Sequence, residues 1–279
     1  MKRLILCFDG TWEARASYRG RYGPYPTNVE KTHIAVSKTD AKGIPQVTAY
    51  YRGIGTDRVS HYLAGLTGWG ISETICDAYA FIVDNFILGE DELYLFGFSR
   101  GAYTARSLSG FMQWIGVVRK DHLTALPEYY AQYRLPESKR DPKMRGDQLQ
   151  VVRQGDQSIP IRFIGVWDTV GALGCPIPGV RLFDSRSNVG FHDTELSRNV
   201  SHAFQALAVH ELRSAFAPAL WSNKNAAQVV EQAWFPGTHC DVGGGNPSHD
   251  LSDIASRGCF VTLKRPRLGL SLIMHTSNK

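Results

Sequence analysis

Apolar residues gather in short continuous runs that each end at a turn, which is typical of strands buried on both faces of a sheet. The first run, Arg3–Phe8, stops at Asp9, Gly10 and Thr11. Similar runs occupy residues 46–51, 92–96, 161–167 and 228–235, and each is followed closely by glycine, aspartate or proline. The pattern predicts five strands.

Between these runs, apolar side chains recur at helical spacing. Residues 70–88 predict an amphipathic helix that packs on a sheet, and residues 28–37 and 102–112 predict two further helices. The stripe of Ala203, Leu207, Val209 and Phe216 predicts another helix over residues 200–216. Strands alternating with helices indicate an α/β fold with a mostly parallel sheet flanked by helices. Functional groups are then expected at the carboxyl ends of the strands.

Two segments depart from this alternation. Residues 121–158 are polar and charged and are interrupted by Pro136, Pro142 and Gly146, so we interpret them as an insertion or cap over the domain surface. Residues 257–279 contain clustered basic residues, Gly258 and Pro266, and they show no helical period. This indicates an atypical tail that arose by truncation or by a shift of reading frame. Residues 1–256 are expected to form one domain.

The overall composition agrees with a single globular domain. The 279 residues are 43% hydrophobic and 20% charged, and the 27 glycines and 13 prolines are dispersed. These values exclude disordered, collagen-like and coiled-coil chains.

No apolar run reaches the ~18 residues that a spanning helix needs, and Met1-Lys2-Arg3 leads into a strand instead of a signal-peptide core. We therefore expect synthesis in the cytoplasm, with any export proceeding without a cleaved signal peptide.

Charge and cysteine content narrow the expected partners. The net charge of +5 is modest, and no basic run alternates with aromatic residues, so no nucleic-acid partner is expected. The five cysteines are odd in number and form no CxxC pair. They favour reduced, buried thiols over a disulfide framework or a zinc site. Neither a metal ion nor a cofactor is expected.

The strongest chemical signal is the segment Gly97-Phe98-Ser99-Arg100-Gly101, which fits the G-x-S-x-G pattern of a nucleophile elbow. In an elbow, a serine lies on a sharp strand-to-helix turn, and side chains at the two glycine positions would collide with that turn. The five-residue pattern alone is weak, but here an apolar strand precedes it and a small-residue helix start follows it. The alternative is a serine that caps a helix in a glycine turn.

A nucleophilic serine needs a base, and the base needs an acid that fixes its tautomer and orientation. In this fold class the chain order is serine, acid, histidine. Asp168 and His239 satisfy that order, and each directly follows a predicted strand or its closing turn. His239 lies in a segment that we interpret as a loop too rich in glycine to be a packed helix face. Candidate acids other than Asp168 are Asp184, Asp193 and Asp241.

Acyl transfer also needs donors for the oxyanion of the tetrahedral intermediate. The backbone N–H of Arg100 is one candidate, because it follows the nucleophile. The second is expected from the Gly10–Thr11 region, where glycine permits close approach. Asp9 is equally explained as a cap of that turn.

Two other glycine-containing segments suggest different chemistry on first inspection. Phe8-Asp9-Gly10-Thr11 resembles the D-x-D-G-T loop of haloacid-dehalogenase-like phosphatases, but Cys7 stands where the attacking carboxylate would be. The glycines at 243–245 lack the lysine of a phosphate-binding P-loop. We interpret them as a flexible turn beside His239.

Six motifs together resemble an uncharacterised α/β-hydrolase domain family that includes the type VI secretion lipase effectors. They are Cys7–Trp12, Thr27–Val29, Tyr51–Thr56, Leu95–Arg106, Val166–Gly171 and Pro236–Gly245. The resemblance implies a serine hydrolase, with phospholipase activity in the secreted effectors. It assigns the nucleophile to Ser99, the acid to Asp168 and the base to His239. Two departures are His210, where the family usually has aspartate, and the segment from Ser256 onward.

We therefore predict a serine carboxylic-ester hydrolase that acts on acyl lipids, as a phospholipase does, through an acyl-enzyme on Ser99. A thioesterase or peptidase would use the same triad. A different class of hypothesis is a non-catalytic α/β-hydrolase-fold module that binds a partner or a membrane surface. The acyl position, oligomeric state and any immunity partner are not determined by the sequence.

Several residues have two interpretations each. Tyr62, Leu63, Leu66, Trp69 and Ile71 form either an apolar lid or part of the core. Trp114 and the 121–158 insertion either meet a membrane peripherally or cover the sheet. Arg100 and Arg106 either attract anionic head groups or have structural roles.

Overall fold

The computed structural model describes residues 1–10, 25–53, 69–144, 158–171, 195–222 and 225–263. Within them, six parallel strands form one sheet in the order β2-β1-β3-β4-β5-β6. The strands are β1 (Arg3–Phe8), β2 (Gln46–Tyr51), β3 (Glu92–Phe98), β4 (Ile161–Trp167), β5 (Val200–Ala208) and β6 (Val229–Phe235). The predicted parallel α/β architecture is confirmed.

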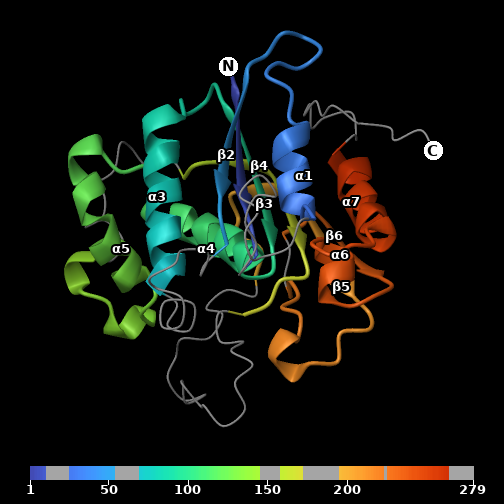
Figure 1. Ribbon diagram of the computed structural model, residues 1–279. Helices are drawn as coiled ribbons and strands as arrows, with labels where there is room; N and C mark the ends of the chain where they lie inside the picture. Colours follow the sequence, from blue (N-terminus) through green and yellow to red (C-terminus); the bar gives the residue numbers. More distant parts are fainter. Residues whose placement is uncertain (11–24, 54–68, 145–157, 172–194, 223–224, 264–279) are drawn as a thin grey trace, which may run out of the picture.

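Helices cover both faces of the sheet (Figure 1). One face carries α3 (Trp69–Asn85) and α4 (Arg100–Ile115), with α5 (Leu126–Tyr133) packed outside them. The other carries α1 (Asn28–Ala35), α6 (His239–Gly243) and α7 (Asp250–Leu263). The remaining described elements are short 3-10 helices: η2 (Lys120–Ala125), η3 (Glu137–Lys139), η4 (Pro142–Met144) and η6 (Ser214–Phe216). Two apolar clusters, one on each face, therefore bury the central strands from both sides.

The predicted helix over residues 200–216 is wrong, because Val200–Ala208 is strand β5. Its alanine-rich stretch has helical spacing, yet both backbone edges pair with neighbouring strands. Phe204 and Leu207 are both buried, although their side chains leave the strand on opposite faces. A strand that is covered on both faces loses the alternation that would have identified it.

Residues 256–263 also differ from the prediction. We expected no helical period after Ser256, but α7 continues through Gly258 to Leu263. A Cβ atom at Gly258 would lie 2.9 Å from the Phe235 ring, so the glycine permits close packing of the helix on β6. The next residue, Cys259, is fully buried against the sheet. Residues 264–279, the rest of the predicted tail, lie outside the described residues.

The described part of the predicted insertion packs on the outer helices. Tyr130 contacts the Phe111 ring of α4 edge-on at 5.2 Å between ring centroids. Trp114 stacks on Phe111 at 6.1 Å, and the Arg140 guanidinium lies 5.3 Å over the Trp114 ring. Trp114 is therefore part of a packed aromatic cluster. Residues 145–157 lie outside the described part of the chain.

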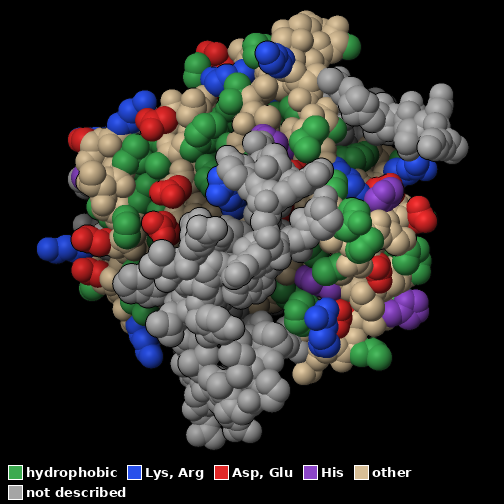
Figure 2. Space-filling view, in the orientation of Figure 1, with side chains coloured by type: hydrophobic (Ala, Val, Ile, Leu, Met, Phe, Trp, Pro, Cys, Tyr) green, Lys and Arg blue, Asp and Glu red, His purple; other side chains and the backbone are tan. Residues whose placement is uncertain are grey.

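Two properties of the described residues concern helix hydrophobicity and surface charge. None of the helices in the described ranges combines the length and apolar character that crossing a bilayer requires. On the face shown in Figure 2, acidic and basic side chains are interspersed over the described elements.

The lid candidates from Tyr62 to Leu66 and the side chain of Trp69 are outside the described residues, whereas Ile71 is buried in the core.

Asn28 joins the helices on one face of the sheet. It is fully buried, and its Nδ2 donates to Val242 O at 2.9 Å and Ser252 O at 2.8 Å. The bonds connect the start of α1 to α6 and α7. A single amide therefore links the three helices that cover this face of the sheet.

We predict that Asn28→Ala lowers the free energy of unfolding by roughly 2–4 kcal/mol, because two buried carbonyl groups lose their donors. Urea unfolding followed by circular dichroism measures the change. The exposed Asn225→Ala variant serves as the control. A loss below about 1 kcal/mol would show that the amide does not hold the helices together.

Candidate active site

Ser99 lies between β3 and α4, on a backbone turn that L-residues rarely adopt. Its φ is 57° and its ψ is −121°. The flanking glycines permit this turn: a Cβ at Gly97 would lie 2.5 Å from Gly101 O, and one at Gly101 would lie 2.1 Å from Phe8 O. The Ser99 side chain makes no helix-capping hydrogen bond. The strand–turn–helix geometry is the one that the G-x-S-x-G pattern predicts. Ser99 occupies the N-cap position of α4, but its side chain does not cap the helix.

Asp168 and His239 come together at the same edge of the sheet. Asp168 directly follows β4, and its backbone is also in the left-handed region, with φ at 41°. Its Oδ2 lies 2.6 Å from His239 Nδ1, and its Oδ1 accepts a hydrogen bond from Ala208 N at 3.0 Å. Both side chains are buried, with exposed fractions of 1% and 5%. A buried carboxylate in this position fixes the tautomer and orientation of the imidazole.

Asp241, another candidate acid, has different hydrogen-bond partners. Asp241 closes a capping box with Thr238 at the start of α6 and accepts from Asn246 Nδ2 at 2.9 Å. These hydrogen bonds, led by that from the Thr238 backbone, lower the pKa of Asp241. Asp184 and Asp193 lie outside the described residues.

His239 is the first residue of a short helix, so the prediction that this segment is a loop is wrong. The glycines that follow serve packing and turn geometry. A Cβ at Gly243 would lie 1.9 Å from the Phe98 ring, and Gly244 and Gly245 have φ of 89° and 97°. The glycine-rich segment therefore brings α6 against the residue that precedes Ser99.

Two aromatic rings hold the His239 imidazole. Phe98 approaches it at 4.6 Å between ring centroids, and Phe216 meets it edge-on at 4.8 Å. Ser99 N donates to Trp167 O at 3.0 Å, which ties the elbow to the residue before Asp168. The described hydrogen bonds of His239 use Nδ1 and the backbone N–H, and none joins Nε2 to the Ser99 hydroxyl. The structure thus joins Asp168 to His239 directly, and Phe98, the residue before Ser99, contacts the imidazole.

The predicted oxyanion region is only partly described. A Cβ at Gly10 would lie 3.3 Å from Ser99 Cβ, so the β1 loop runs directly beside the elbow. However, Gly10 N donates to Asp9 Oδ1 at 2.8 Å. Arg100 begins α4, where backbone N–H groups lack intrahelical acceptors. Thr11 lies outside the described residues.

Asp9 is a buried junction that the sequence only partly indicated. Besides Gly10 N, it accepts from Thr27 Oγ1 at 2.9 Å and from the Tyr50 hydroxyl. Burial raises the pKa of Asp9 to about 6, although the hydrogen bonds from Tyr50, Gly10 and Thr27 oppose the shift. The capping role holds, and it extends to β2 and the N-terminus of α1. Asp9 and Thr27 both belong to motifs found in the sequence, and this was the one indication there that the two residues could be in contact.

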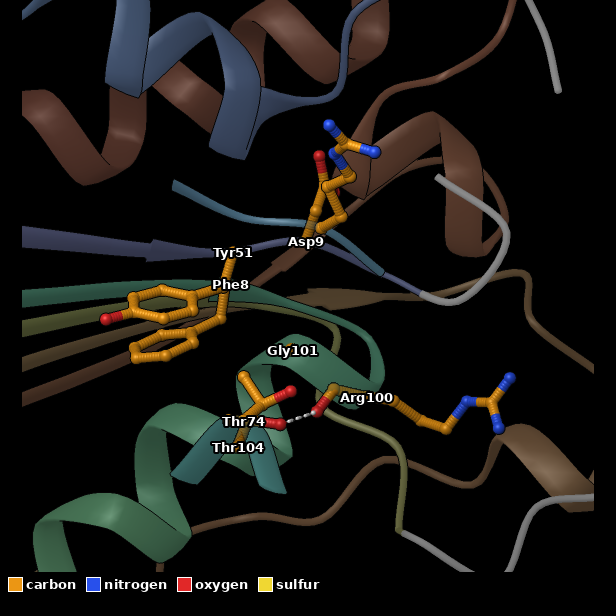
Figure 3. A pocket seen from close by; sticks show the side chains of 8 residues that line it. Phe8, Asp9, Tyr51, Thr74, Arg100, Gly101 and Thr104 are labelled. Atoms are coloured by element: carbon orange, nitrogen blue, oxygen red, sulfur yellow. Dashed lines mark hydrogen bonds between the residues drawn. The ribbon is translucent and has the colours of Figure 1, made fainter. Parts of the chain in front are cut away.

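A pocket opens beside the elbow, lined by residues of β1, β2, α3 and α4 (Figure 3). Its lining includes Arg100 and also Arg52, which follows β2. In this view the Arg100 side chain extends away from the stacked rings of Phe8 and Tyr51. Arg106 is instead buried, donates to Ala219 O and Leu220 O, and lies over Trp221. Its role is therefore structural.

Within the described ranges, no cluster of three or more histidine, cysteine or carboxylate side chains is arranged to hold a metal ion. Asp168 and His239 instead form a buried carboxylate–imidazole pair, and Ser99 lies at the carboxyl end of a strand in the same sheet. This arrangement is suited to acid–base and nucleophilic chemistry.

Comparison with known proteins supports the assignment of the fold. Residues 2–258 match the family model described as T6SS, phospholipase effector Tle1-like, catalytic domain. An uncharacterized protein of Saccharomyces cerevisiae, YEL023C, is 27% identical over 237 residues, which are 77% of this chain and 32% of that protein. The chain therefore spans about a third of that relative's length.

Two solved structures are also similar. An uncharacterized protein from Pseudomonas aeruginosa superposes with a TM-score of 0.53 at 16% identity, over 97% of this chain and 46% of that one. The Tle1 effector bound to the VgrG spike of the type VI secretion system gives a TM-score of 0.41 at 22% identity, over 88% of this chain and 51% of that one. This chain thus corresponds to about half of either protein.

The raised pKa of Asp9 has a consequence for stability. Between pH 4 and 6 the folded chain retains a proton on Asp9 that the unfolded chain, with a pKa of 3.8, has released. Stability therefore falls as the pH rises through this window. We predict that the free energy of unfolding of wild type, relative to Asp9→Asn, decreases by on the order of 3 kcal/mol between pH 4 and 7.

Urea unfolding of both proteins at each pH measures this difference, and other titrating groups cancel in the comparison. A difference that stays constant with pH would show that Asp9 titrates normally in the folded protein. A difference that moves in favour of wild type as the pH rises would show a lowered pKa.

Proposed function

Because this chain belongs to the family of Tle1-like phospholipase effector catalytic domains, we propose that it is a serine hydrolase of acyl-lipid esters. The observation that carries the proposal is the buried 2.6 Å contact between Asp168 and His239, at the sheet edge where Ser99 occupies its strained turn. Neither a helix cap nor a packed core explains two left-handed residues and a buried carboxylate–imidazole pair at one edge.

In the proposed reaction, Ser99 Oγ attacks the ester carbonyl carbon while His239 Nε2 takes the hydroxyl proton. Asp168 holds Nδ1 and stabilises the imidazolium that forms. The tetrahedral intermediate collapses, His239 gives the proton to the departing alcohol, and an acyl-enzyme remains on Ser99. Water, activated by the same imidazole, then releases the fatty acid. The described hydrogen bonds do not include one between Ser99 and His239. In this proposal that hydrogen bond forms when substrate binds, since catalytic hydrogen bonds often tighten only in the complex.

The oxyanion is proposed to be bound by Arg100 N–H and by a donor of the Gly10–Thr11 loop. Since Gly10 N–H already donates to Asp9, we assign Gly10 the role of close approach and Thr11 N–H the role of donor. Together two such donors supply several kcal/mol of transition-state stabilisation.

The substrate class is proposed from the family and from the pocket. Every phospholipid head group carries an anionic phosphate, and Arg52 and Arg100 line the pocket beside the elbow. Arg106 is excluded from this role by its burial. A thioesterase would use the same residues, so a panel of acyl esters, acyl thioesters and amides distinguishes them. Preferred cleavage of thioesters or amides would reject the substrate class.

We predict that Ser99→Ala abolishes labelling by a fluorophosphonate probe and lowers kcat for ester hydrolysis by roughly 10⁶-fold. The matched control is Ser107→Ala, on the half-buried face of the same helix. It should retain both properties. Folded wild-type protein that neither reacts with the probe nor hydrolyses esters would favour the non-catalytic binding module.

We also predict that His239→Gln lowers kcat nearly as much as Ser99→Ala, and that Asp168→Asn lowers it by roughly 10⁴-fold by favouring the wrong tautomer. Steady-state kinetics on a soluble short-chain ester test both variants, with circular dichroism to check folding. Unchanged turnover in either variant would remove that residue from the triad.

A further inference from the structure

The segment after β5 runs beside the segment that carries His239. Val209 N donates to Phe235 O at 3.0 Å, and His210 N donates to Gly237 O at 3.0 Å. In return, Gly237 N donates to His210 Nδ1 at 2.9 Å. His210 thus supplies an acceptor for this amide at the position where the family usually has aspartate. The register brings the next residue, Glu211, to the backbone of His239.

The Glu211 carboxylate is buried, with only 4% of its side chain exposed. Its Oε2 accepts from His239 N at 3.3 Å, and both oxygens accept from the Arg213 guanidinium, at 2.7 and 2.6 Å. Oε1 also accepts from Arg213 N at 2.9 Å. The hydrogen bonds from Arg213 lower the pKa of Glu211 to about 2, so it stays ionised at neutral pH. A bidentate pair of this kind is geometrically rigid.

Arg213 also reaches the His239 ring, indirectly, through Phe216. Its guanidinium carbon lies 3.8 Å from the centroid of the Phe216 ring, and Phe216 meets the His239 ring edge-on. One ion pair therefore contacts the His239 backbone directly and its ring through Phe216.

We propose that Glu211 is a positioning residue for His239, acting with Arg213 to fix the base against Asp168 and Phe98. The proposal rests on the proposed hydrolase function, in which the imidazole must lie within reach of Ser99. Misplacement of a reacting group by about 1 Å costs up to ~10²-fold in rate without weakening substrate binding. Glu211 touches no reacting atom, so its loss should appear in kcat and not in KM.

The test compares Glu211→Ala and Glu211→Gln with Glu137→Gln, an exposed control far along the chain in η3. We expect Glu211→Ala to lower kcat by roughly 10- to 100-fold with KM within about twofold of wild type. Glu211→Gln keeps the side-chain volume and should lower kcat by about tenfold, which covers the case in which the alanine variant does not fold. Arg213→Ala should resemble Glu211→Ala.

A second readout is the low-field proton resonance of the His239 Nδ1–H bound to Asp168, assigned by its absence in His239→Gln. We expect this resonance to broaden or disappear in the Glu211 variants and to persist in Glu137→Gln. The proposal is overturned if kcat stays within about twofold of the control, if KM rises while kcat is unchanged, or if kcat falls with the resonance intact.

The experiments can contradict the proposed hydrolase function and the proposed role of Glu211 independently of each other. If wild type hydrolyses no ester, the proposed function fails, and the resonance alone decides the role of Glu211. Its loss in Glu211→Gln then supports positioning of the imidazole, and its persistence overturns it.

Discussion

The close approach of the α4 N-terminus to the ends of β1 and β3 is the constraint on which the site depends. A side chain at Gly101 would overlap the Phe8 carbonyl, and one at Gly97 would overlap the first turn of α4. With both glycines present, the chain reverses within one residue, and Ser99 takes a positive φ. Such strain persists only where surrounding packing over-determines it. Here the sheet and α4 supply that packing, and the Ser99 side chain is kept out of the helix cap.

Three buried carboxylates belong to the described site, and each is compensated for the loss of water in a different way. Asp168 is paired with His239 and a backbone N–H. Glu211 is neutralised by the guanidinium of Arg213. Asp9 has only neutral donors, and its pKa rises accordingly. The difference explains why Asp9 stabilises the architecture best when protonated, whereas Glu211 is ionised across the neutral range.

Much of the fold followed from local pattern. Five strands end where glycine, aspartate or proline interrupts an apolar run, and the helices over α1, α3 and α4 follow from apolar spacing. β5 did not follow, because its alanines satisfy a helical period as readily as a buried strand. The prediction that no helix continues past Ser256 was wrong for a related reason. Glycine by itself disfavours a helix, but here a side chain at Gly258 would collide with Phe235.

For the site, the sequence indicated that Ser99, Asp168 and His239 each follow a strand, here β3, β4 and β6. Parallel strands bring their carboxyl ends to one edge, so the three residues were expected there. The sequence also contained the glycines that make the elbow possible. Only the tertiary structure decided that Asp168, and not Asp241, meets the imidazole, and that Glu211, Phe216 and Tyr50 join the surroundings. The physical reason is the sequence separation of the residues that interact. Turn geometry and the spacing of apolar residues depend on neighbours in the chain. Hydrogen-bond partners and ring contacts are instead set by which distant segments the packed sheet brings together.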